Sequence, residues 1–519
     1  MKEQFKEPAG AIRRLFGLFT ALCAIATIVC MIDSGTGLQE LLDNLAQLCT
    51  QPAQLTKSFF DASYGGFAAT FLNVFLICLI CSLLYTLPGA KPDGLSVLAF
   101  FLTAGFSFWG ITILNVWFLF VGVALYSLVK KKPLGSLVNA MLFATGLCPL
   151  ATDLLLRYPG AELHGVTFGS FVLTLVVCAC VGFILPAGLA HSPNVHKGYC
   201  LYSAALPMGL TAFFLRALLY KMLGGVLPEA AGVGTGDSFP ALCYTFCAVV
   251  FLLAIALGLW LGGGKKYGQL LKDTGFGADY GAKYGFETAV LNFGVYGLFI
   301  VLYYTLIGAN WNAVTLGCVF CMVCCCFKGS HPANVWSIMV GYVAASFAMK
   351  ALCGVMGTEG ALAINAQAII VGLCFANGLS PVAGRYGWFS GILAGVAHYT
   401  LVTCVPLLHG GYLLYNGGFT GCICALVHGG HEYRLATYRG ARVEHWSGGG
   451  AVVSQGRWLL TAQLLGSGAR PLRAPVRGSM GRTVHESVGT QLRLRLMRGG
   501  ETVVEHTDEC AGFEYSGGD

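Results

Sequence analysis

The sequence predicts an all-α integral membrane protein of about 12–14 transmembrane helices, arranged mainly as two inverted six-span repeats. Three observations support this fold class. The chain is rich in hydrophobic residues and poor in charges, its apolar residues form blocks long enough to cross a bilayer, and three motifs occur twice in the same order.

Composition excludes an ordinary soluble protein. Of 519 residues, 56% are hydrophobic and 11% are charged, whereas soluble domains carry about 25% charged residues. The mean hydropathy is +0.70. Blocks such as 67–87, 241–261 and 389–407 have the length of about 20 residues that spans the hydrocarbon core as a helix. They lack the alternation of a membrane β-strand.

Five regions follow from these blocks and from the composition of the chain. They are an N-terminal transmembrane helix with an external loop (1–66), membrane repeat 1 (67–217), a linker with one transmembrane helix (218–285), membrane repeat 2 (286–428) and an atypical soluble or disordered tail (429–519).

Three duplicated motifs carry the prediction of a repeat. FWG with NVW (108–117) returns as FKG with NVW (327–336), ATGLCP (144–149) returns as ANGLSP (376–381), and HKGYCLY (196–202) returns as HGGYLLY (409–415). An odd number of spans between corresponding points would invert the second repeat relative to the first. Inverted repeats are a recurring architecture of transporters, with the site where the repeats meet.

The Gly-Leu-x-Pro motifs predict helix breaks within the membrane, because proline removes a donor and glycine loosens the backbone. The freed backbone groups could bind a substrate, or the breaks could be kinks needed for packing. As a substrate pathway the motifs contribute Gly146, Leu147, Cys148, Pro149, Asn377, Gly378, Leu379, Ser380 and Pro381.

Asn115 and Asn334 are a further pair of pathway candidates, each just before Val-Trp. An amide in the membrane can join helices or contact a polar solute. The alternative is a helix cap or an interfacial anchor.

Five ionisable residues are candidates for gating or pairing. His196 and His409 open the last span of each repeat, and His398 lies inside a span. Asp153 and Arg385 each follow a motif proline by four residues, so they could pair across the repeat interface. They could equally be two separate loop ends.

Loop charges predict a cytoplasmic N-terminus under the positive-inside rule. Most basic loop residues then fall on the cytoplasmic side: Lys91, Lys130, Lys131, Lys132, Lys197, Lys265, Lys266, Lys272, Lys283, Lys328 and Arg385.

The tail differs from the rest of the chain. Residues 429–519 contain 11 Arg and no Lys, whereas residues 1–428 contain 5 Arg and 15 Lys. This abrupt change favours a reading-frame artefact or a disordered tail. The alternative is a small β-rich appendage, because residues 491–504 alternate and turn at 499–500. No chemistry is assigned to the tail.

The motifs around 327–336, 377–381 and 408–419 resemble a bacterial family of uncharacterised membrane proteins, domain of unknown function 1576. The resemblance covers about residues 10–428 and implies a multi-pass protein of the bacterial plasma membrane, without an established activity. Residues 408–427 also resemble a region of urea transporters, which are inverted duplications.

The leading functional hypothesis is a transporter or channel for a small polar solute, with the lipid bilayer as its surroundings. We expect no cofactor, no metal site and no nucleic-acid partner, and a homo-oligomer is left open. The rival hypotheses are a membrane-embedded enzyme acting on a lipid-linked substrate through His398, His409 or Asp153, and a non-catalytic membrane subunit.

Overall fold

The computed structural model describes residues 5, 7–51, 58–228 and 237–426, together with three strands further along the chain. The chain divides into two units, Met1–His428 and Gly429–Asp519. We call the first the membrane unit. Every regular element in its described part is a helix.

Eight helical segments of the membrane unit are long and apolar enough to cross a bilayer. They are α1 (Pro8–Ser34), α3 (Gly66–Leu84), α6–α7 (Leu134–Leu156), α8 (Phe168–His196), α10 (Pro240–Leu261), α13 (Phe286–Leu306), α15 (Pro332–Met356) and α16–α17 (Gln367–Tyr386). The chain is a multi-pass membrane protein, as predicted. The number of crossings and the inverted repeat remain predictions.

Shorter helices complete the membrane unit. Four of them are apolar: α4 (Gly94–Phe106), α5 (Val116–Lys130), α14 with its 3₁₀ turn (Ala313–Phe327) and α18 (Trp388–Val402). The others are α2 (Leu38–Thr50), α9 (Ala205–Leu215) with a π-helix (Arg216–Met222), α11 (Gly264–Leu270), α12 (Tyr280–Tyr284), α19 (Val405–Leu408) and a helix over 416–426.

Local sequence explains where several of these helices begin. Asp93 and Ser96 form a capping box at α4, and Thr167 and Ser170 form one at α8, so orphan N–H groups find partners. Proline stands near the start of a helix, where its missing N–H costs nothing. Both Gly-Leu-x-Pro motifs use this rule.

The two predicted breaks are present as 3₁₀ turns. Thr145–Leu147 joins α6 (Val138–Ala144) to α7 (Cys148–Leu156), and Asn377–Leu379 joins α16 (Gln367–Ala376) to α17 (Ser380–Tyr386). The motif proline is the second residue of the new helix in both cases. At each motif the α-helix therefore passes through one 3₁₀ turn and then continues as a second α-helix.

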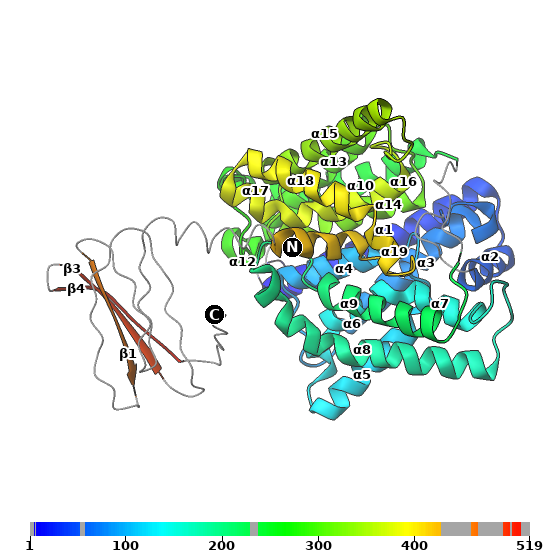
Figure 1. Cartoon of the computed structure of the whole chain (residues 1–519), viewed down its shortest axis with the longest axis horizontal. Helices are drawn as coiled ribbons and strands as arrows, with labels where there is room; N and C mark the ends of the chain where they lie inside the picture. Colours follow the sequence, from blue (N-terminus) through cyan, green and yellow to red (C-terminus); the bar gives the residue numbers. More distant parts are fainter. Residues whose placement is uncertain are drawn as a thin grey trace. The chain divides into compact units, whose positions relative to one another are not determined.

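The broken helices lie at the centre of the membrane unit. In α16–α17 89% of the most apolar window is buried, and in α6–α7 78%, against 33% in α15. In Figure 1, α5 and α8 lie along one edge of the unit, α15 and α18 lie towards the opposite edge, and α4 lies between. The outer helices thus leave apolar surface for lipid.

Helices α4 and α14 pack antiparallel at this centre. Gly105, near the end of α4, lies against the backbone of Gly317, near the start of α14. The Cys321 thiol lies 3.8 Å from the Leu102 carbonyl oxygen. The start of α4 at Gly94 and the residue Gly329 after α14 both contact the 273–280 loop.

Two glycine pairs bring outer helices into backbone contact. A Cβ on Gly122 of α5 would overlap the Ala179 carbonyl of α8, and one on Gly182 would overlap the Leu119 carbonyl. Gly341 of α15 and Gly395 of α18 make the same crossing. Small residues permit such close approach in membranes, where packing rather than the hydrophobic effect joins helices.

The second unit contains three described strands, β1 (Trp458–Leu465), β3 (Gln491–Arg498) and β4 (Glu501–Glu509). They pair antiparallel in the order β1-β3-β4. The predicted alternating segment falls in β3 and the start of β4.

Substituting Gly395→Ala should destabilise the membrane unit by about 1–3 kcal/mol, because the added methyl group forces α15 and α18 apart. The midpoint of thermal unfolding in detergent should fall. Gly17→Ala in α1 is the matched control, since a Cβ there meets nothing within 4 Å. Equal melting temperatures for the two variants would contradict the close crossing.

Candidate functional site

Two irregular segments contact the breaks from elsewhere in the membrane unit. We call residues 196–203 and 409–416 the crossing segments. The Leu201 N–H donates to the Gly378 carbonyl at 3.0 Å, and the Leu414 N–H donates to the Gly146 carbonyl at 2.9 Å. We call residues 67–217 and 286–428 the two halves of the unit. The glycine carbonyl of each break therefore has a backbone partner from the other half.

Each crossing segment starts with two successive residues in the left-handed region. These are Lys197 and Gly198 (φ 52° and 83°) and Gly410 and Gly411 (φ 62° and 77°). Such residues reverse the chain directly after a helix. The reversal turns the following residues back towards the centre, where they reach the breaks.

Aromatic rings separate the two breaks. Tyr415 packs on Gly146 and Tyr202 packs on Gly378, where a side chain larger than hydrogen would not fit. Phe375 lies between the tyrosines, with ring centroids 5.1 Å from Tyr202 and 5.9 Å from Tyr415. Together with Phe106, which contacts Phe375 and Tyr415, we call these rings the central aromatic cluster.

The two tyrosines differ in their hydroxyl contacts. The Tyr202 hydroxyl lies 2.7 Å from the Cys321 carbonyl oxygen and 2.8 Å from Asn377 Oδ1, and Asn377 Nδ2 donates to the Met322 carbonyl at 2.6 Å. Within the described residues the buried Tyr415 hydroxyl has no hydrogen-bond partner. The remaining pathway candidates of the two motifs are all buried at or beside the breaks: Leu147, Cys148, Pro149, Leu379, Ser380 and Pro381.

Asn115 and Asn334 close turns before α5 and α15. Asn115 Oδ1 accepts from the Thr112 N–H at 2.9 Å and Nδ2 donates to the Gly110 carbonyl at 3.0 Å. Asn334 makes the equivalent bonds to the His331 N–H at 3.0 Å and the Gly329 carbonyl at 2.8 Å. These bonds match the capping alternative, but Asn115 Nδ2 also donates to the Thr152 hydroxyl of α7 at 2.9 Å, so Asn115 joins two helices as well.

The three candidate histidines are buried and separately bonded. His398 contacts the Tyr342 hydroxyl at 2.5 Å and the Gly417 carbonyl at 2.8 Å. His196 Nε2 lies 2.8 Å from the Ser203 hydroxyl, and His409 Nδ1 lies 2.7 Å from Asn416 Oδ1. In each half, the histidine that opens a crossing segment contacts the last residue of that segment.

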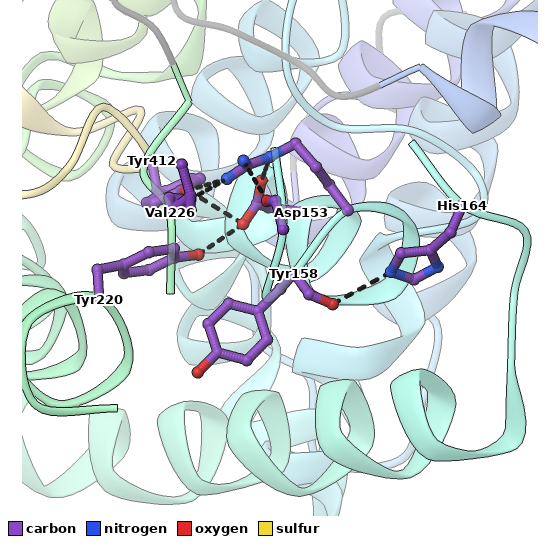
Figure 2. Close-up of polar contacts among 8 residues, drawn as sticks. Asp153, Tyr158, His164, Tyr220, Val226 and Tyr412 are labelled. Carbon is purple, nitrogen blue, oxygen red and sulfur yellow. Dashed lines mark hydrogen bonds and ion pairs between the residues drawn. The ribbon is translucent and has the colours of Figure 1, made fainter. Parts of the chain in front are cut away.

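Asp153 has a different partner from the one predicted. It pairs with Arg157, one helical turn away, at 2.5 Å, and both side chains are at least 95% buried. Figure 2 shows the hydroxyls of Tyr220 and Tyr412 pointing at Asp153, with oxygen–oxygen distances of 2.6 and 3.0 Å. We call these four residues the ion-pair cluster.

Arg157 makes further hydrogen bonds within and around the ion-pair cluster. Its guanidinium donates to the carbonyls of Gly160 and Val226 and to the Tyr412 hydroxyl at 2.7, 2.8 and 3.2 Å. Tyr220 comes from the π-helix, a feature often found at functional sites. The cluster therefore joins α7, the π-helix and a crossing segment.

The predicted pair of Asp153 and Arg385 is thus corrected. The Arg385 guanidinium lies over the rings of Phe276 and Tyr199, 4.7 and 5.8 Å from their centroids, and the Tyr199 hydroxyl lies 2.7 Å from that of Tyr386. A carboxylate four residues from an arginine on one helix has a nearer partner than any residue of another repeat. We call Arg385, Tyr199, Phe276 and Tyr386 the cation–ring cluster.

A second ion pair joins the loop before α12 to α12 itself. Asp273 accepts from Lys283 at 2.6 Å and from the Tyr284 hydroxyl at 2.7 Å. Burial acts to raise the pKa of Asp273, but these bonds and one from the Gly275 N–H outweigh it and lower the pKa. Lys283 is 59% exposed, so the pair should contribute about 0–1 kcal/mol.

The cysteine-rich stretch at 324–326 packs into the core. Among the described residues, no group of three His, Cys, Asp or Glu side chains is arranged to hold a metal ion.

Asp153→Asn should destabilise the membrane unit by about 3–5 kcal/mol, because it leaves the Arg157 charge buried without a counter-ion. Thermal unfolding in detergent measures the loss, and Asp153→Leu with Arg157→Met should recover part of it. Lys283→Met is the control on the second pair, whose lysine is 59% exposed. It should change stability by less than about 1 kcal/mol, because Asp273 keeps its bonds from the Tyr284 hydroxyl and the Gly275 N–H. If Asp153→Asn lowered the stability no more than Lys283→Met, the charges of Asp153 and Arg157 would not be coupled.

Comparison with known proteins places the chain in a family. No curated protein and no solved structure matches it. The family model described as "Protein of unknown function (DUF1576)" matches residues 38–221 and 265–430, which is more than half of the chain. The matched segments contain both breaks, both crossing segments and the ion-pair cluster, and the chain belongs to this family of proteins of unknown function.

Proposed function

We propose that the membrane unit is an inverted repeat that transports a small polar solute along the interface between its halves. The observation that carries this proposal is the reciprocal pairing of each break with the crossing segment of the other half. Broken helices meeting between inverted repeats are where transporters bind their solutes.

Matched contacts support the repeat. Asn73 of α3 donates to the carbonyls of Ser107 and Ile111, and Asn292 of α13 donates to those of Cys326 and Ser330. The glycine crossings match in register as well, because Gly122 and Gly341 each lie seven residues after the motif asparagine. Gly182 and Gly395 each lie 14 residues before the histidine of a crossing segment.

The direction of α4 and α14 supports the inversion. Each is the short helix that precedes an NVW motif, so the two occupy corresponding places in the halves. They pack antiparallel, with Leu102 beside Cys321 and Gly105 beside Gly317. Corresponding helices that run in opposite directions are the signature of an inverted repeat.

A cytoplasmic N-terminus is part of the proposal. The loop that carries Lys91 contacts the one that follows Lys132, since Gly135 lies against Pro88 and Ala90. The start of α4 contacts Asp279, in the loop that carries Lys283. These basic loops share one face, which the positive-inside rule assigns to the cytoplasm, in keeping with a bacterial inner-membrane protein.

Two clusters would close the two ends of the pathway. Tyr412 of one crossing segment joins the ion-pair cluster, and Tyr199 of the other joins the cation–ring cluster. The central aromatic cluster fills the space between the breaks. Release of one crossing segment at a time would open the centre to one side and then to the other.

The enzyme hypothesis has less support. Its candidates His398, His409 and Asp153 belong to three different hydrogen-bonded groups, bonded to Tyr342, Asn416 and Arg157 respectively. A reaction centre would need such side chains to converge on one reacting group.

Transport is tested with purified protein in proteoliposomes, by uptake of a panel of labelled small polar solutes. Gly378→Ala should reduce uptake about tenfold, because the new methyl group presses on Tyr202 and about 1.4 kcal/mol corresponds to a factor of ten. Gly354→Ala is the control, since a Cβ there meets nothing within 4 Å. Unchanged flux of the transported solute in Gly378→Ala would remove the breaks from the mechanism.

Inversion is tested by the sidedness of corresponding loops. Lys132→Cys, after α5, and Glu359→Cys, after α15, are exposed positions. An impermeant maleimide should label Glu359→Cys in intact cells and Lys132→Cys only in inside-out vesicles, with the wild-type chain as background control. Labelling of both from the same side would refute the inversion.

A further inference from the structure

The two crossing segments differ in how their buried polar groups are satisfied. In the first, His196 Nδ1 accepts from the Gly198 N–H at 3.2 Å and Nε2 contacts Ser203 at 2.8 Å, so both ring nitrogens have partners. In the second, His409 Nε2 and Asn416 Nδ2 have no hydrogen-bond partner among the described residues. His409 is 1% exposed and Asn416 is 2% exposed.

The two unpartnered atoms belong to one dyad. His409 Nδ1 and Asn416 Oδ1 share a hydrogen bond of 2.7 Å. His409 Nε2 lies across the imidazole ring from this bond, and Asn416 Nδ2 is the other polar atom of the bonded amide group. The dyad therefore presents two unsatisfied hydrogen-bonding groups, which point away from the bond that joins the two residues.

The chemistry of the dyad defines its ligand. Because Asn416 Oδ1 can only accept, His409 Nδ1 carries the proton, and a neutral ring then presents a lone pair at Nε2. Asn416 Nδ2 presents its N–H groups. Exchanging the amide atoms and the tautomer reverses the two roles, but it still leaves one donor and one acceptor.

The surroundings of the dyad come from both halves of the membrane unit. The His409 ring packs edge-on against Phe419, 5.0 Å between centroids. Phe419 in turn occupies the space left by the absent side chain of Gly209 in α9. The dyad thus lies beside an apolar wall where the halves meet, a setting that favours a neutral ligand over an ion.

We infer that His409 and Asn416 bind the solute, and that the solute is a small neutral molecule that carries both a hydrogen-bond donor and an acceptor, as a primary carboxamide does. The inference rests on the proposed transport function and names the substrate class at its interface. Leaving either atom unpaired in the buried dyad costs free energy that such a ligand recovers.

The experiment uses the full chain in proteoliposomes and labelled acetamide, acetate and methylammonium as probes. Acetamide should enter, and Asn416→Ser, which copies the residue of the first crossing segment, should reduce its uptake about tenfold. Gly354→Ala, where an added Cβ meets nothing within 4 Å, is the control and should leave uptake near the wild-type rate.

The outcomes separate the two proposals. Preferred uptake of acetate or methylammonium by the wild-type chain would overturn the inferred solute class while leaving transport intact. Acetamide uptake that Asn416→Ser does not change would overturn the site. Binding of acetamide to the purified protein by calorimetry without any flux would support the site and reject transport, and neither binding nor flux would reject the site itself.

Discussion

The membrane unit depends on two backbone hydrogen bonds, from Leu414 to Gly146 and from Leu201 to Gly378. Lipid offers no water to a carbonyl released by a broken helix, so each break needs a partner from the protein. The crossing segments supply it. Their double left-handed turns, the glycines under the tyrosine rings and the antiparallel packing of α4 on α14 all bring these segments to the breaks.

The same bonds explain why the centre is rich in polar groups but firmly packed. Tyr202 and Asn377 join a break to backbone carbonyls of the segment 321–322, and Phe375 fills the space between the two tyrosines. The glycine crossings of α5 on α8 and of α15 on α18 make each outer pair stiff, because backbone contact leaves no side chain that can rotate. In the proposed transport cycle, movement would therefore belong to the crossing segments and their neighbours.

The sequence was sufficient for the features that depend on local chemistry. Long apolar blocks predicted the membrane class, and the Gly-Leu-x-Pro motifs predicted the breaks, because glycine and proline act on their own backbone. The motif asparagines were identified from the sequence, and their bonds to partners within five residues match the capping alternative. The further bond from Asn115 to Thr152 joins two helices. The spacing of Asp153 and Arg157 was an available signal, which pairing by repeat position overlooked.

What the sequence did not reveal depends on distant packing. Nothing local shows that Phe276 and Tyr199 lie beneath Arg385, that Tyr220 and Tyr412 meet at Asp153, or that Leu201 reaches Gly378.

The ion pair of Asp153 and Arg157 has a consequence that reaches beyond packing. Since both charges sit on one turn of chain, the acid carries its own counter-ion, and departure of Tyr412 would break hydrogen bonds without leaving a lone charge in the low-dielectric interior. In the proposed transporter, a closure built in this way would separate the free-energy cost of opening from the cost of moving a charge.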